Sequence, residues 1–168
     1  MNIQADIGNK VITMYKHCES NDKYISLHDC HVTKVVYDNG VLTFVFDDGI
    51  WILDEHPNNV TKKTVRTDKA EMNFRLESGE PYDVTFYVFE EKMKKIIRNE
   101  WDLNKMIKSV NSGQCTIELL YDYNGYNSMI IEGELWSKKK PYNRECELKI
   151  SVTDVEYYWN NLCEDRMW

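Results

Sequence analysis

The densest group of chemically reactive side chains is the tetrapeptide His28-Asp29-Cys30-His31. Two further candidates, His17 and Cys18, lie upstream. Imidazole and thiolate groups are zinc ligands. If the tetrapeptide is extended, alternate residues share a face, so only two ligands converge where zinc needs three or four. We therefore expect no metal site and no cofactor here, with a zinc site completed by His17 or Cys18 as the alternative.

Cys30 is also a candidate nucleophile. Cysteine catalysis needs an imidazole within hydrogen-bond distance of the sulfur and a third group that orients it. His31 would point away from Cys30 on an extended chain, and no glycine turn is present to expose the thiol. We expect the tetrapeptide to consist of turn and edge residues with one buried cysteine. A hydrolase that uses Cys30 is a less favoured alternative.

Two carboxylates, Glu132 and Glu134, share one face of a strand-like segment with Trp136. Paired carboxylates perform acid–base catalysis when burial raises the pKa of one of them. Here the alternation places them opposite the apolar side chains of Met129 and Ile131, which favours a partly solvated outer face. A hydrolase that uses these carboxylates is the alternative.

Aromatic side chains are abundant, with 5 Trp and 11 Tyr, and several fall on the polar faces of strands. Trp and Tyr dominate binding hot spots because they bury a large area at a low entropy cost. Trp136 is our leading anchor for a partner, and Tyr157, within Tyr157-Tyr158-Trp159, is a second candidate. A two-layer core with aromatics on both sheet faces is the alternative, in which Trp136 is buried under a helix.

Acidic residues exceed basic ones by 28 to 21, which gives a formal net charge of −7. Many of them fall in expected turns, Asp47 and Asp48 among them. If they converge, they would attract a basic protein and accelerate its association. The same charge disfavours nucleic-acid binding, whose nonspecific affinity comes from Lys and Arg. The candidate partner-binding residues are thus Trp136, Glu132, Glu134, Tyr157, Asp47 and Asp48.

The composition is that of a globular domain, with 42% hydrophobic and 29% charged residues. Apolar runs are no longer than those of the Ile50–Leu53 kind, whereas a bilayer-spanning helix needs roughly 20 residues. Five cysteines form an odd set without a Cys-x-x-Cys pair, which argues against a disulfide framework. The first twenty residues lack a secretory signal. We expect a cytoplasmic protein that does not bind membranes.

Period-2 alternation predicts strands through most of the chain. Residues 71–77 and 82–89 predict a hairpin joined through residues 78–81. Residues 117–123 and 129–135 predict a second hairpin that turns at Asn124-Gly125, with Leu119 and Ile131 on the same buried face. The run 146–152 is expected to lie beside the preceding strand.

The remaining segments predict a short meander and one helix. Residues 32–37, 41–46 and 50–53 read as three strands joined by tight turns. Residues 102–111 read as an amphipathic helix capped by Asp102 and ended by Gly113. Residues 90–100 fit either a helix or a strand. The first twenty residues are ambiguous, and we expect them to be partly mobile.

Together these elements predict a mainly β fold, an antiparallel β-sandwich or open barrel of about nine strands with one helix. The periodicity does not distinguish a sandwich from a barrel. No repeat or linker divides the chain, so residues 1–168 are expected to form a single domain.

Several segments of the chain resemble small acidic β-rich proteins of Gram-positive bacteria that have no assigned function. These segments are 107–113, 123–127, 132–136, 140–142 and 156–159, with the turn at 48–51. The resemblance implies a bacterial cytosolic protein and carries over no site residues. In size and acidity, although not in motif, the chain is also similar to immunity proteins that neutralise toxins.

We therefore expect a non-enzymatic interaction module that binds another protein, with toxin neutralisation as its most concrete form. The alternative is a carrier whose sheet closes around an apolar cavity for a small ligand. The third hypothesis is a hydrolase.

Overall fold

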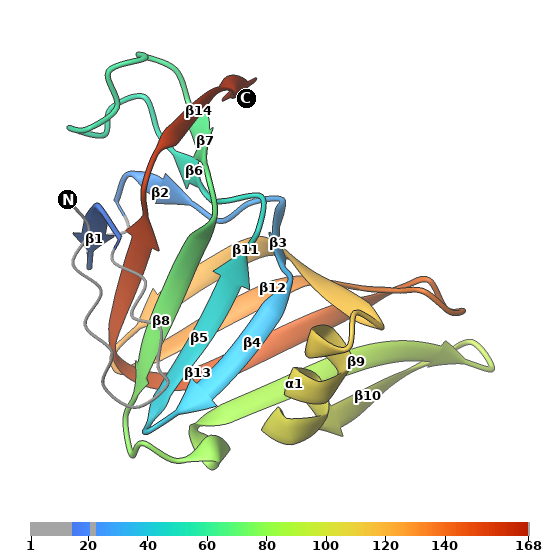
Figure 1. The fold of residues 1–168 in the computed structure, drawn as a ribbon. Helices are drawn as coiled ribbons and strands as arrows, with labels where there is room; N and C mark the ends of the chain where they lie inside the picture. Colours follow the sequence, from blue (N-terminus) through green and yellow to red (C-terminus); the bar gives the residue numbers. More distant parts are fainter. Residues whose placement is uncertain (1–14, 21–22, 168) are drawn as a thin grey trace.

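The computed structural model describes residues 15–20 and 23–167, and the first fourteen residues, where part of the expected mobile segment falls, lie outside the described residues (Figure 1). The elements in chain order are β1 (His17–Glu19), β2 (Ile25–Ser26), β3 (Cys30–Val32), β4 (Lys34–Asp38), β5 (Val41–Phe46), β6 (Trp51–Ile52), β7 (Val65–Thr67), β8 (Ala70–Leu76), the 3-10 helix η1 (Pro81–Asp83), β9 (Val84–Lys92), β10 (Lys95–Trp101), α1 (Leu103–Asn111), β11 (Cys115–Gly125), β12 (Ser128–Ser137), β13 (Asn143–Trp159) and β14 (Leu162–Met167).

The fold is mainly β, as predicted, although the described residues form fourteen strands and not about nine. Ten strands join one sheet whose main path runs β3-β11-β12-β13-β8-β5-β4, with β1, β9 and β10 attached beside it. The other four form a small sheet in the order β14-β7-β6-β2. Four of the strands that were not predicted, β1, β2, β3 and β7, have only two or three residues, too few for alternation to mark them. The strand β14 has six residues and was also missed.

Strand β13 is the seam of the large sheet. Its first part pairs with β12 and β9, and its second part pairs with β8 and β1. The register shifts between Val152 and Asp154, where the strand passes from one half of the sheet to the other. A bulge of this kind bends a strand and lets it serve two sheet layers.

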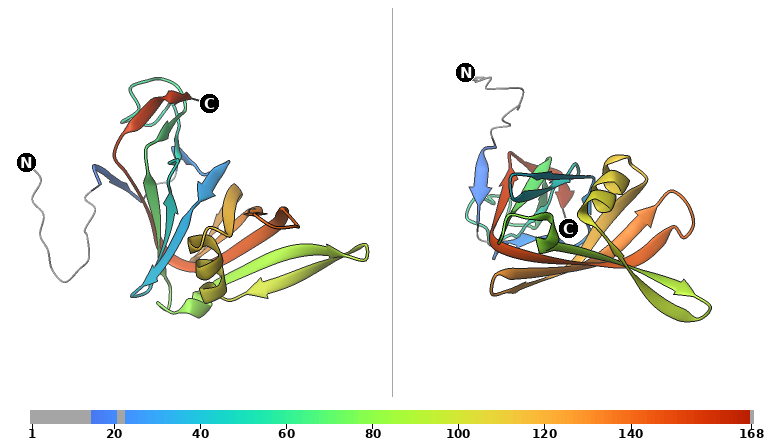
Figure 2. Two further views of the ribbon diagram at one scale, coloured as in Figure 1. Left: turned by 45° about the vertical axis from the view of Figure 1, so that its right-hand side comes forward. Right: turned by 90° about the horizontal axis from the view of Figure 1, so that it is seen from below.

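A second corner lies between β3 and β4, which are separated only by Thr33. Strand β3 pairs with β11, whereas β4 pairs with β5. The Thr33 backbone N–H donates to the Val45 carbonyl at 2.9 Å, so the hydrogen bonding to β5 begins at this corner. The two halves of the sheet open like a V, and α1 lies between them, against β4 on one side and β9 and β11 on the other (Figure 2). This arrangement is an open barrel with two bent corners.

Side chains of both halves fill the interior. Phe44 and Phe74 meet edge to face with ring centroids 5.0 Å apart, and Phe86 meets Trp101 at 5.7 Å. Leu119 and Ile131 are both buried, and β11 and β12 are antiparallel, which confirms the predicted buried face of this hairpin.

The predicted helix is confirmed as α1. The Asp102 carboxylate accepts a hydrogen bond from the Lys105 N–H at 2.8 Å, and Gly113 follows the helix with a φ of 67°. The Asn111 carboxamide then donates to the Val35 carbonyl and accepts from the Val35 N–H, each at 2.8 Å. The end of the helix therefore satisfies the backbone of β4, which is an edge strand.

The hairpin predicted from residues 71–77 and 82–89 is wrong. Strand β8 pairs with β5 and β13, and β9 pairs with β10 and β13, so the two strands enter different halves of the sheet. The buried Asp83 carboxylate fixes the corner between them by accepting hydrogen bonds from the Ser78 backbone N–H at 2.8 Å and hydroxyl at 2.7 Å. Local alternation identified both strands, but it cannot specify which strand is the neighbour.

The turn of the β11–β12 hairpin also differs from the prediction. Asn124 and Gly125 continue the ladder opposite Met129 and Ser128, and the turn is formed by Tyr126 and Asn127. Asn127 takes the positive φ of 48°. Asparagine tolerates this conformation, so a glycine was not required there.

The expected meander is confirmed only for its first two strands. Strands β4 and β5 form a hairpin, but β6 pairs with β2 and β7 in the small sheet. The ambiguous stretch 90–100 contains the end of β9, the turn and most of β10, with Met93 and Lys94 in the turn at φ values of 51° and 63°. None of the helices in the described part of the chain has the length and apolar character needed to cross a membrane.

Candidate functional site

Five glutamates lie on the outer face of β11, β12 and β13, where they alternate with buried residues of the core. Glu134 on β12 stands directly opposite Glu118 on β11 and Glu145 on β13. In the next row, Glu132 stands opposite Glu147. We call these five side chains the acidic face. Like charges directly opposite each other destabilise a sheet, so this arrangement is unfavourable for the isolated protein.

Few cations offset this charge. The Lys149 ammonium lies 3.3 Å from the Glu147 carboxylate, and the His31 imidazole lies 3.7 Å from that of Glu118. Glu132, Glu134 and Glu145 form no ion pair with any residue that the structure describes. The centre of the acidic face is therefore open to cations from outside.

Aromatic side chains border the acidic face. The Trp136 side chain is 42% exposed, and its indole N–H donates to the Glu118 carboxylate at 2.6 Å. Trp136 is therefore not buried under the helix. Tyr121 stands directly opposite Glu132 and is 56% exposed, and Tyr123 lies two residues further along β11. The structure thus brings together three of the sequence candidates: Trp136, Glu132 and Glu134.

Tyr87 on β9 closes the other side of this surface. The Arg98 guanidinium lies 4.3 Å from its ring centroid, and the Lys149 ammonium lies 5.6 Å from it. Both cations are drawn to the electron-rich face of the ring. The acidic face therefore has an aromatic border toward β11 and a cationic border toward β10.

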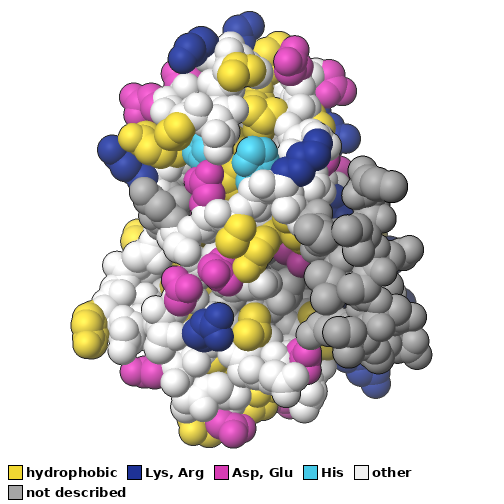
Figure 3. Space-filling view, turned by 60° about the vertical axis from the view of Figure 1, so that its left-hand side comes forward, with side chains coloured by type: hydrophobic (Ala, Val, Ile, Leu, Met, Phe, Trp, Pro, Cys, Tyr) yellow, Lys and Arg dark blue, Asp and Glu magenta, His cyan; other side chains and the backbone are white. Residues whose placement is uncertain are grey.

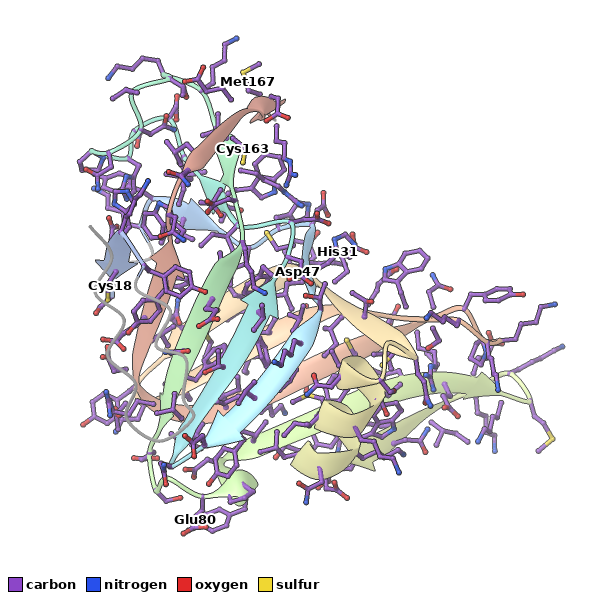
Figure 4. All side chains as sticks on the ribbon, in the orientation of Figure 1. Cys18, His31, Asp47, Glu80, Cys163 and Met167 are labelled. Atoms are coloured by element: carbon purple, nitrogen blue, oxygen red, sulfur yellow. The ribbon has the colours of Figure 1, made fainter. Side chains whose placement is uncertain are left out.

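The other three candidates do not join the acidic face. Tyr157 is buried, with 2% of its surface exposed, so this candidate for partner contact was wrong. It points inward because β13 has changed sheet halves before this residue. Asp47 and Asp48 follow β5, where Figure 4 labels Asp47 at the upper end of the strand. Each already faces a cation: Asp47 lies 3.2 Å from Lys69, and Asp48 lies 4.0 Å from Arg166.

The histidine–cysteine group is occupied by structural contacts. The Nδ1 atom of His28 hydrogen-bonds to the Leu120 carbonyl at 2.7 Å, at the bulge of β11. The Cys30 thiol is buried and faces the carbonyls of Ser26 and His28. Burial raises the pKa of Cys30 to about 12. A thiol in this state is a poor nucleophile at neutral pH.

Sequence reasoning missed a buried polar cluster beneath the loop 53–64. His56 is buried, its Nε2 atom lies 2.8 Å from the Glu19 carboxylate, and its Nδ1 atom accepts from the Asn58 N–H at 3.1 Å. The buried Asn59 carboxamide donates to the carbonyls of Leu53 at 2.9 Å and Lys63 at 2.8 Å. Figure 3 views this side of the molecule, where histidine and acidic side chains lie close together. These hydrogen bonds fix the conformation of the loop. Hydrophobic periodicity in the sequence does not predict them.

Sequence reasoning also missed Glu118, Glu145 and Glu147 as members of the acidic face. Their signal was present, since Glu145 and Glu147 alternate with the buried Cys146 and Leu148. The register of β11 and β13 against β12 was needed to place these glutamates opposite Glu134 and Glu132.

A pocket of about 440 Å³ lies between the β11–β12 turn and the bend of β13. Its lining includes polar residues on both sides, such as Asn124, Asn127 and Asp154. Small-ligand sites are mainly apolar and enclosed. This open, polar hollow does not have the character of a carrier site.

No protein-family model, curated protein or solved structure matches this chain. The functional assignment therefore depends on the geometry of the acidic face.

Proposed function

We propose that this protein is a non-enzymatic interaction module that binds a basic protein partner through the acidic face and its aromatic border. The observation that carries the proposal is the row Glu118–Glu134–Glu145, in which three carboxylates stand opposite one another on adjacent strands. Lysine or arginine side chains of a partner would relieve this repulsion. Binding would thus recover free energy that the isolated sheet lacks.

The aromatic border would supply the short-range part of the affinity. Trp136 and Tyr121 are partly exposed, beside the carboxylates. An indole or phenol ring can cover the aliphatic stem of a lysine and attract its ammonium group. Carboxylates would steer the partner, and the rings would hold it.

The most concrete form of this function is neutralisation of a basic toxin in the bacterial cytoplasm. The net charge of −7 supports a basic protein as the partner and disfavours nucleic acid. We propose no membrane binding. The buried Cys30 thiol, with its raised pKa, does not favour the hydrolase alternative. The open, polar pocket does not favour the carrier alternative.

Site-specific photo-crosslinking tests the proposal. A photoreactive phenylalanine analogue replaces Tyr121 in one variant and Tyr82 in another; Tyr82 is 75% exposed but lies in η1, outside the acidic face. We expect the Tyr121 position, and not the Tyr82 position, to capture in host cells a protein rich in Lys and Arg. Capture should fall when Glu132→Gln and Glu134→Gln are combined.

Salt provides a second criterion. At about 0.5 M salt, charge attraction is screened beyond about 4 Å, so capture at Tyr121 should decline. Equal capture at Tyr82 and Tyr121, or capture of an acidic protein that salt does not affect, would contradict the proposal.

A further inference from the structure

The pocket of about 440 Å³ between the β11–β12 turn and the bend of β13 has no part in the proposed function, and we call it the turn pocket. Two hydrogen bonds tie its walls together. The Val152 backbone N–H donates to the Asn127 carbonyl at 3.1 Å, and the Asn127 carboxamide donates to the Glu77 carboxylate at 3.1 Å. These contacts join the hairpin turn to β13 and to the end of β8, and they give the turn pocket its shape.

The charge of the turn pocket indicates which class of ligand it fits. Asp154 is the only charged side chain among the described residues that line it. Arg75 stands opposite Asp154 on β8, but the Asp154 carboxylate forms no ion pair with any residue that the structure describes. An anion would therefore meet only repulsion in the pocket. A cation would be attracted by Asp154, by the nearby Glu77 carboxylate and by the net charge of −7.

Hydrogen-bond acceptors in the lining suit an ammonium group, which has three N–H donors and no acceptor. Asp154 supplies a carboxylate, and Ser128 supplies a hydroxyl. Because the Asn127 amide nitrogen already donates to Glu77, the carboxamide oxygen of Asn127 is left as a third acceptor.

Aromatic and aliphatic groups in the lining suit the chain that carries such an ammonium. Tyr126 is 95% exposed at the hairpin turn, so its ring face is accessible to a cation. Val152 and Tyr157 are largely buried and contribute apolar surface, against which methylene groups can pack. The lining thus combines one carboxylate, neutral acceptors, a ring and apolar surface.

We propose that the turn pocket binds a primary ammonium group carried on an aliphatic chain, with Asp154 as its counter-ion. Two sources present this chemistry, namely a lysine side chain of another protein and a free aliphatic diamine. The inference does not depend on the proposed function, because the turn pocket shares no residue with the acidic face. An open site holds a small ligand weakly, so we expect dissociation constants in the millimolar range.

Titrations of the full chain followed by backbone amide NMR test the site. The probes are 1,5-diaminopentane, the N-acetyl methylamide of lysine, and 1,5-pentanediol, which has the same chain length as the diamine but no charge. We expect both amines to shift the amide signals of residues 124–128 and 152–155, and the diol to bind about tenfold or more weakly. The amine that binds more tightly identifies the source.

Variants of the chain assign the binding to particular groups. Asp154→Asn should weaken both amines about tenfold or more, because it removes the charge and keeps the shape of the side chain. Tyr126→Ala, at an exposed residue, should weaken them severalfold. Asp54→Asn is the matched control, because it removes the same charge from an exposed residue of the loop 53–64 and should leave the affinity unchanged.

Three results would overturn the inference. The first is equal binding of the diol and the diamine, and the second is an absence of shifts in the turn pocket at about 50 mM amine. The third is amine binding that persists in Asp154→Asn and disappears when Glu132→Gln and Glu134→Gln are combined, which would place the amine on the acidic face. None of these results affects the proposed function, which is tested separately by capture at Tyr121.

Discussion

Trp101 and Trp136 lie in the same half of the sheet and face opposite ways. Trp101 is buried against Phe86, whereas Trp136 lies on the outer face with its indole on Glu118. The same side chain thus serves the core at one position and is available to a partner at the other. The side of the sheet on which each ring lies decides its role.

A matched pair of truncations tests this difference. Trp136→Ala should weaken binding of the captured partner about thirtyfold and leave the melting temperature nearly unchanged, because little buried surface is lost. Trp101→Ala should lower the free energy of unfolding by about 3–5 kcal/mol. Thermal denaturation and a binding titration measure both effects. A large loss of stability with unaltered affinity in Trp136→Ala would show that Trp136 is only structural.

At the scale of elements, neighbouring strands are positioned by single residues with special roles. Gly133 on β12 has no room for a side chain, since an added Cβ would lie 2.0 Å from the Glu118 carbonyl oxygen. This close approach adjoins the bulge of β11 at Leu120. The helix α1 has a comparable role at the opposite edge, where Asn111 pairs with the backbone of Val35.

Removing this carboxamide tests how much the helix contributes to the edge of β4. Asn111→Ala leaves the Val35 N–H and carbonyl without their partner and should lower the free energy of unfolding by about 1–3 kcal/mol. Asn104→Ala, on the exposed side of the same helix, is the control. It should have little effect or stabilise slightly, because alanine favours helix. Equal effects of the two variants in urea denaturation would contradict the proposed role of Asn111.

At the scale of the whole molecule, the bends in β13 and at Thr33 enclose a core that buries thiols away from water. Burial raises the pKa of Cys30 from the usual 9.0 to about 12, and it also raises that of Cys146. The thiolate is therefore disfavoured in the folded state and favoured in the unfolded chain at alkaline pH.

This difference predicts a loss of stability at high pH. Below pH 9, Cys30 is protonated in both states and does not affect the balance. Between pH 9 and about 12, unfolding releases its proton, so the free energy of unfolding falls by about 1.4 kcal/mol per pH unit for this group. Urea denaturation at increasing pH should show a shallower decline in Cys30→Ala than in wild type. Parallel declines would contradict the prediction.

The sequence by itself determined those features that depend on neighbouring residues in the chain. Alternation located the principal strands, and Asp102 and Gly113 bounded α1, because capping and periodicity are local properties. Alternation also placed Glu132, Glu134 and Trp136 together, since all three lie on one strand. The mainly β class followed from the same local signals.

Only the tertiary structure decided which strands are neighbours and on which side of the sheet a residue lies. The bulge near Val152 turns Tyr157 inward, and the separation of β8 from β9 sends two adjacent strands into different halves of the sheet. Neither follows from local pattern, because strand partners are chosen by packing between distant segments. The row Glu118–Glu134–Glu145 differs, because β11, β12 and β13 follow one another in the sequence and were predicted to be neighbours. There the tertiary structure decided only the register that places the three carboxylates directly opposite one another.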